Sequence, residues 1–148
     1  MDFMVTNQKS KMKIKNLIII EDEPFQIHEI ITALNLALFK RKKKTYESSS
    51  KLENELISKG LKIEKFSTNK EILKKFKKAI PVNTVIILDG NLKDGTTDGL
   101  FKLFSTESKK LTLVRSVDYR FCERARQNDF KNFAGKSIIS DENCLNLG

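Results

Sequence analysis

The sequence has little cysteine and histidine and no long hydrophobic run. Its 148 residues include two cysteines, Cys122 and Cys144, and one histidine, His28. These three residues lack the spacing of a zinc site, and so few cysteines fit a protein of the reducing cytosol. No apolar run approaches the roughly 20 residues of a membrane span, and the N-terminal residues lack the apolar segment of a signal peptide. We therefore expect a cytoplasmic protein without a membrane span.

Length and charge limit the domain number and the kind of partner. A chain of 148 residues fits one domain, since domains commonly have about 100–200 residues. We expect a flexible N-terminal arm over residues 1–13 and a single domain over 14–148. The net charge of +9 permits attraction to nucleic acid, anionic lipid or an acidic protein. Composition alone does not choose among these partners.

Short apolar runs alternate with helical patterns, which predicts a parallel sheet covered by helices on both faces. The strands are expected over residues 17–20, 61–66, 85–88, 111–114 and 130–134. Residues 61–66 alternate apolar with charged residues, which indicates a half-exposed edge strand. Helices are expected over residues 24–39, 70–79, 100–104 and 119–128, with Asn69 as the cap of the second. His28 lies off the apolar stripe of the first helix, so we expect it to be exposed.

An insertion is predicted over about residues 41–56, at the end of the first helix. It opens with a run of five basic residues from Lys40 to Lys44 and ends in the helical pattern Leu52, Leu56 and Ile57. Such a basic run is more often a solvated surface than a docking patch. Binding of nucleic acid through this run is an alternative, although no recognition motif accompanies it.

Carboxylates follow two of the predicted strands. Glu21 and Asp22 come directly after the first strand, and Asp89 comes directly after the third. The carboxyl ends of neighbouring parallel strands meet at one edge of a sheet, where ligands bind in this class of fold. Clustered carboxylates repel one another and need a cation, and hard oxygen ligands suit Mg²⁺. Lys136 and the hydroxyl of Ser116, at the ends of other strands, could hold a group bound to Asp89.

Three stretches of this sequence resemble the receiver domain of two-component response regulators. They are the first strand with its acidic pair, the third strand with the loop after it, and the aromatic residue and lysine near the last strand. In sequence letters these are LIIIEDEP from Leu17, VIILDGNL from Val85 and FAGK from Phe133. The resemblance covers about residues 14–137 and implies a flavodoxin-like α/β fold, a (βα)5 three-layer sandwich with strand order 2-1-3-4-5.

The resemblance also implies roles for individual residues. Asp89 would accept a phosphoryl group, and Lys136 would pair with that group. Glu21, Asp22 and Asp89 would hold Mg²⁺ together with the backbone carbonyl of Asn91. The family carries a hydroxyl residue after the fourth strand, where this sequence has Arg115 and then Ser116. Either Ser116 supplies the hydroxyl or Arg115 has replaced it.

The function implied by the resemblance is that of a stand-alone receiver in bacterial two-component signalling. A histidine kinase or a phosphotransfer protein would phosphorylate Asp89, and an unidentified downstream protein would receive the signal by contact. The sequence also departs from the family pattern, because Phe133 has no hydroxyl at the aromatic switch position and Ser137 stands where proline is usual. Arg115, the insertion and the short last helix favour an alternative, a degenerate receiver that is never phosphorylated and acts as an interaction module.

Overall fold

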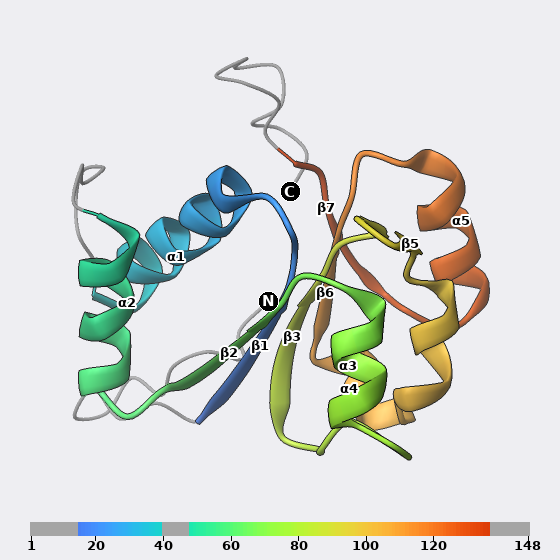
Figure 1. The fold of residues 1–148 in the computed structure, drawn as a ribbon, viewed down its shortest axis with the longest axis horizontal. Coiled ribbons are helices and arrows are strands. Elements are labelled where there is room, and N and C mark those ends of the chain that lie inside the picture. Colours follow the sequence, from blue (N-terminus) through green and yellow to red (C-terminus); the bar gives the residue numbers. More distant parts are fainter. Residues whose placement is uncertain (1–14, 40–47, 137–148) are drawn as a thin grey trace.

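A five-stranded parallel sheet forms the middle layer of the protein (Figure 1). The computed structural model describes residues 15–39 and 48–136. The order of the strands across the sheet is β2-β1-β3-β6-β7, which confirms the predicted order, with β6 and β7 as the fourth and fifth strands. The strands are β1 Asn16–Ile20, β2 Lys62–Phe66, β3 Thr84–Leu88, β6 Thr112–Arg115 and β7 Asn132–Ala134.

The two central strands are buried on both faces. β3 is buried along its whole length, and in β1 only Asn16 is partly exposed. The two strands pair in parallel from Asn16 opposite Thr84 to Ile20 opposite Leu88. A continuous apolar run suits such a strand, because both of its faces lie under helices. The register places the residues that follow Ile20 and Leu88 side by side at the carboxyl edge.

Helices α1 (Pro24–Phe39) and α2 (Ser49–Ser58) cover one face of the sheet (Figure 1). Ser48 caps α2 by accepting the backbone N–H of Lys51. Leu52 and Leu56 of α2 have no exposed surface and pack in one core cluster with α1 and the sheet. The described part of the predicted insertion is therefore a helix of the core, whereas its basic run from Lys40 to Lys44 lies outside the described residues.

His28 differs from its predicted exposure. Its side chain is half-buried, and its Nδ1 lies 2.5 Å from the Ser49 hydroxyl of α2. Nearby, the side-chain amide of buried Asn35 donates to the carbonyl oxygens of Ile31 and Leu52. The prediction of exposure was wrong because α2 packs along this side of α1, and no local pattern in the sequence indicates that contact. Hydrogen bonds therefore join α1 and α2 beside their apolar contact.

The opposite face carries the helices that follow β2, β3 and β6 (Figure 1). Phe121 and Phe130 are fully buried there, and Phe101 lies against both of their rings, with centroids 5.7 and 5.0 Å away. Aromatic rings at these separations pack favourably in tilted and edge arrangements. The elements of this face are α3 Asn69–Lys75, the 3-10 helix η1 Asp98–Leu103, α4 Thr106–Lys110 and α5 Tyr119–Gln127.

Several boundaries on this side differ from the prediction. α3 ends at Lys75 because Phe76 is already extended, and Thr68 rather than Asn69 caps its start. α4 was not predicted, and the short helix expected over 100–104 is the 3-10 helix η1. β7 begins at Asn132 because Asp129 has a φ of 71°, which turns the chain before buried Phe130.

A small hairpin lies in the loop after β3. β4 (Asn91–Leu92) pairs antiparallel with β5 (Gly95–Thr96). Between these strands, Asp94 accepts the backbone N–H groups of Asn69 and Lys70 at the start of α3. The loop after β3 is thereby fixed to the first turn of α3. Among the described residues, no helix is long and apolar enough to cross a membrane.

If α2 is part of the core, truncating its buried side should destabilise the fold. We expect Leu52→Ala to lower the free energy of unfolding by about 2–5 kcal/mol, because it leaves a cavity between α1, α2 and the sheet. Urea denaturation followed by circular dichroism would measure the change. Ile57→Ala, on the exposed side of the same helix, is the matched control and should change stability by about 0.5 kcal/mol or less. Equal effects of the two substitutions would contradict a core role for α2.

Candidate functional site

The candidate site lies at the carboxyl edge of the sheet, where β1 and β3 end side by side. The Asp89 N–H donates to the carbonyl of Ile20, and the Glu21 N–H donates to the carbonyl of Phe66, both at 3.0 Å. The ladder of the sheet therefore continues one residue past each strand. Glu21 and Asp89 are 2% and 3% exposed, so two carboxylates are buried at this edge.

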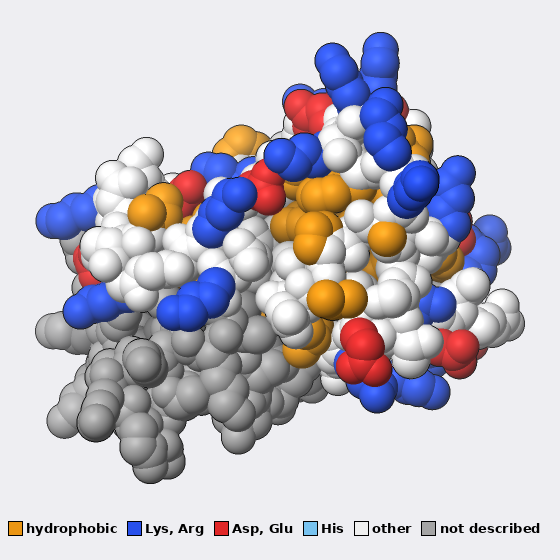
Figure 2. Space-filling model, turned by 90° about the horizontal axis from the view of Figure 1, so that it is seen from below, with side chains coloured by type: hydrophobic (Ala, Val, Ile, Leu, Met, Phe, Trp, Pro, Cys, Tyr) orange, Lys and Arg blue, Asp and Glu red, His pale blue; other side chains and the backbone are white. Residues whose placement is uncertain are grey.

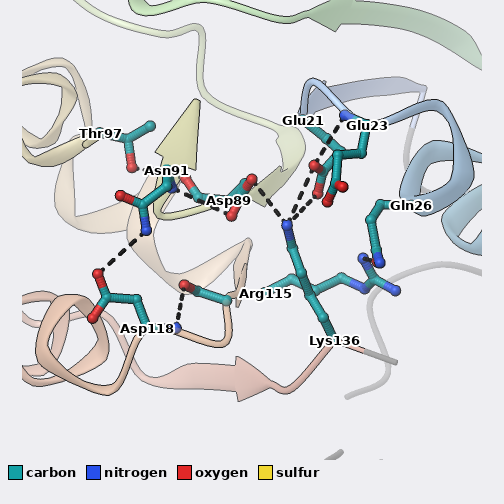
Figure 3. Close-up of polar contacts among 10 residues, drawn as sticks. Glu21, Glu23, Gln26, Asp89, Asn91, Thr97, Arg115, Asp118 and Lys136 are labelled. Atoms are coloured by element: carbon teal, nitrogen blue, oxygen red, sulfur yellow. Dashed lines mark hydrogen bonds and ion pairs between the residues drawn. The ribbon is translucent and has the colours of Figure 1, made fainter. Parts of the chain in front are cut away.

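Lys136 lies between these two carboxylates (Figure 3). It follows β7 by two residues and is itself buried. Its Nζ is 2.9 Å from Asp89 Oδ2 and 3.0 Å from Glu21 Oε1. Buried charges are tolerated only when they are paired, and here one ammonium group pairs with two carboxylates. The three side chains that the sequence assigned to one edge do meet there.

The shared lysine leaves an excess of negative charge in the pocket. Burial, and secondarily the charge of Asp89, raise the pKa of Glu21 to about 7, although Lys136 acts in the opposite direction. Burial alone would lower the pKa of Lys136, but its hydrogen bonds and charge interactions with Asp89 and Glu21 raise that pKa above the ordinary value. Lys136 therefore stays protonated, and the pocket favours an additional positive charge or a proton on Glu21.

The acidic residues have the donor set of a divalent cation site. Glu21, Asp22 and Asp89 each offer a carboxylate oxygen, and these oxygens all lie within 4.8 Å of one another. Asp22 is only partly buried, which leaves access for solvent ligands. The N–H of Asn91 donates to Asp89 Oδ1 at 3.3 Å, so Asn91 lies beside the same carboxylate. Oxygen donors with room for water fit Mg²⁺ better than a softer metal.

Arg115 rather than Ser116 is aligned with Asp89. β3 and β6 pair in register up to Leu88 opposite Val114, so the next positions are Asp89 and Arg115. The guanidinium of Arg115 is directed to α1, where its Nη1 donates to Gln26 Oε1 at 2.7 Å (Figure 3). Burial lowers the pKa of Arg115, while the charges of Glu21, Glu29 and Asp89 oppose this effect. A second cation therefore contributes to the field of the pocket.

Ser116 faces the loop after Asp89 instead. Its buried hydroxyl accepts the N–H of Asp118 at 3.0 Å. A Cβ placed on Gly90 would lie 2.8 Å from this hydroxyl and 2.5 Å from Cδ2 of Phe121, so residue 90 must be glycine. No hydrogen bond between Ser116 and Asp89 occurs in the structure's described part, and a role for Ser116 toward a bound group stays a prediction.

Sequence reasoning missed two residues that hold the loop after Asp89. Thr97 is fully buried, and its hydroxyl donates to the Asp89 carbonyl at 2.8 Å. Asp118 accepts the side-chain amide of Asn91 at 3.2 Å and also caps α5 through the N–H groups of Arg120 and Phe121. An aspartate directly before a helical pattern is a recognisable cap, so Asp118 could have been found. Thr97 carries no comparable signal.

Comparison with known proteins supports the fold. No protein-family model and no curated protein matches the sequence. Among solved structures, the chain is similar to the response regulator receiver domain from Rhodospirillum rubrum, with a TM-score of 0.53. The two are 17% identical, and the match covers 88% of this chain and 86% of that chain. At this identity the likeness shows the fold, so the predicted flavodoxin-like receiver fold is confirmed, while the roles of individual residues remain predictions.

The raised pKa of Glu21 predicts a pH dependence of stability in metal-free protein. Because the folded-state pKa of about 7 lies above the ordinary 4.5, the folded protein binds this proton more tightly than the unfolded chain. The contribution is therefore present at low pH and is lost as pH rises through about 7. Relative to Glu21→Gln, the wild type should lose about 1–3 kcal/mol of stability between about pH 5 and 8.

Urea denaturation in a metal chelator, repeated across this pH range, would measure that difference. Glu23→Gln is the matched control, because Glu23 is exposed and only its backbone N–H contacts Glu21. Its stability curve should run parallel to that of the wild type. Parallel curves for wild type and Glu21→Gln would instead show that the buried carboxyl does not titrate as its surroundings indicate.

Proposed function

We propose that this protein is a receiver that accepts a phosphoryl group on Asp89 from a histidine kinase or a phosphotransfer protein. The observation that carries the proposal is the buried carboxylate of Asp89, which Lys136 contacts at 2.9 Å beside two further acidic side chains. Transfer of a phosphoryl group demands mainly alignment and neutralisation of charge. The phosphorylated protein would then pass the signal to a downstream protein by direct contact.

The side chains around Asp89 suit this transfer. Lys136 holds Oδ2, and the N–H of Asn91 contacts Oδ1, so the orientation of the carboxylate is fixed before a donor arrives. One carboxylate oxygen attacks the phosphorus atom while the bond from phosphorus to the donor nitrogen breaks. The electron pair of that bond stays on the nitrogen, and the donor ring, which carries a proton on its other nitrogen, leaves as neutral imidazole. Lys136 is placed to compensate the charge that the phosphoryl oxygens bring. Glu21, Asp22, Asp89 and Asn91 would hold Mg²⁺, which supplies further neutralisation when bound.

A receiver that is never phosphorylated is the second candidate, and Arg115 favours it. Arg115 occupies the position aligned with Asp89 and is held by Gln26 on α1. Lys136 also pairs with both buried carboxylates. Two cations would then stabilise the pocket permanently, and the domain would act through its surface. Phosphoryl uptake distinguishes the two candidates.

The proposal predicts that Asp89 takes up one phosphoryl group. Incubation with acetyl phosphate and Mg²⁺ should add one phosphoryl group to the intact wild-type protein, and Asp89→Asn should add none. Asp129→Asn is the matched control, because Asp129 is exposed, lies at the far edge and has a positive φ that asparagine tolerates. Intact-mass spectrometry measures the products. Equal masses of treated wild type and Asp89→Asn would favour the unphosphorylated module.

A second prediction concerns the divalent cation and Arg115. Titration with Mg²⁺ should shift amide resonances at the ends of β1 and β3, and Glu21→Ala/Asp22→Ala should abolish those shifts. Arg115→Gln should tighten Mg²⁺ binding severalfold at low salt, because it removes a positive charge that acts on Glu21 and Asp89. NMR titrations would give both results.

Arg120→Gln is the control for the change in charge, since Arg120 is exposed on α5. It should leave the affinity for Mg²⁺ nearly unchanged. If wild type and Glu21→Ala/Asp22→Ala respond identically to the metal, these carboxylates do not form the site. Weaker binding by Arg115→Gln would mean that Arg115 supports the site rather than opposing the cation.

A further inference from the structure

In the described part of the chain, lysines gather where the strands begin, at the amino edge of the sheet. Five described segments lead into the strands, over residues 15–16, 59–62, 76–84, 109–112 and 128–132, and their one acidic residue is Asp129. The same segments carry eight lysines: Lys15, Lys59, Lys62, Lys77, Lys78, Lys109, Lys110 and Lys131. Acidic residues follow the strands at the other edge, around the pocket described above. The amino edge is therefore a basic surface.

Most of these lysines have no acidic partner among the residues that the structure describes. Lys110 pairs with Glu107 at 3.6 Å, and Lys109 lies over the ring of Phe130. Both belong to the last turn of α4, where a cation stabilises the helix dipole. The other six lie outside the helices, and Lys59 among them is the C-cap residue of α2. Holding like charges together is unfavourable, and an anionic partner would relieve the repulsion.

The loop between α3 and β3 adds exposed apolar residues to this surface. Lys77 and Lys78 are followed by exposed Ala79, Pro81 and Val82, and Val82 is 54% exposed. Buried Ile80 anchors the loop through its N–H, which donates to the carbonyl of Leu103. Asn83, with a φ of 63°, turns the chain into β3. Figure 2, which looks onto this edge, shows a group of apolar side chains with many basic and a few acidic side chains around it.

We propose that the amino edge binds the surface of an anionic lipid bilayer, with Val82 in contact with the membrane and the lysines against the headgroups. Lysines near an anionic leaflet each strengthen binding, and an apolar group inserted between headgroups adds to it. Nucleic acid would use the charges but would leave the exposed Val82 and Pro81 without a role. The proposal is independent of phosphorylation, because the two sites lie at opposite edges of the sheet.

Co-sedimentation of the full chain with vesicles tests the proposal. The protein should bind vesicles of mixed phosphatidylcholine and phosphatidylglycerol and should dissociate from them at high salt. It should not bind vesicles of pure phosphatidylcholine. Lys77→Glu/Lys78→Glu should weaken binding by about tenfold or more, since each lysine contributes separately. Val82→Ser should weaken it by about threefold to tenfold. Asp89→Asn should bind as the wild type does, which separates this result from the proposed function.

The control variant is Lys70→Glu/Lys93→Glu, which makes the same change of charge. Both lysines are exposed and lie at the carboxyl edge, after β2 and β3. This variant should retain most of the vesicle binding. The proposal is overturned if wild type does not bind anionic vesicles, if both double variants lose vesicle binding equally, if Val82→Ser binds normally, or if wild type binds duplex DNA more tightly than anionic vesicles. Equal urea midpoints would confirm that the variants are folded.

Discussion

Two buried carboxylates share one buried ammonium group, and this contact joins the ends of three strands of the sheet. Glu21, Asp89 and Lys136 follow β1, β3 and β7, so the pocket forms only when first, central and last strands are in place. The group carries one more negative charge than positive charge. That imbalance is unfavourable in the folded protein and at the same time makes the pocket receptive to a cation. Stability of the folded protein thus favours a protonated Glu21, whereas binding of a cation favours the ionised Glu21 carboxylate.

Much of the fold could be predicted because strand runs and helical stripes are local signals. A continuous apolar run such as Val85, Ile86, Ile87 and Leu88 is typical of a strand that is covered on both faces. The convergence of Glu21, Asp22 and Asp89 follows from the order of the strands. The packing of α2 on α1 was not predictable, because Leu52 and Leu56 indicate that one side of the helix is apolar but not which element covers that side. His28 was therefore placed in solvent.

The finer geometry of the site depends on contacts between distant residues. The alignment of Arg115 with Asp89 follows from the register of β3 and β6, which one sequence does not reveal. The hairpin of β4 and β5 depends on Asp94 accepting N–H groups from α3, a contact across more than twenty residues. The partners of Arg115 and Asp94 therefore depend on the three-dimensional structure. That acidic residues follow two of the strands, in contrast, could be predicted from the sequence alone.

The absence of a side chain at Gly90 links the site to α5. The space that a Cβ would fill is occupied by the ring of Phe121 and the hydroxyl of Ser116. Phe121 in turn packs against Phe101 of η1, so the loop after Asp89 is connected through side-chain contacts to two helices. Close-packed interiors transmit displacement instead of absorbing it. A shift of the backbone at Asp89 by even a few tenths of an ångström would therefore have to move α5, which makes this contact a mechanical connection between the pocket and the outer surface.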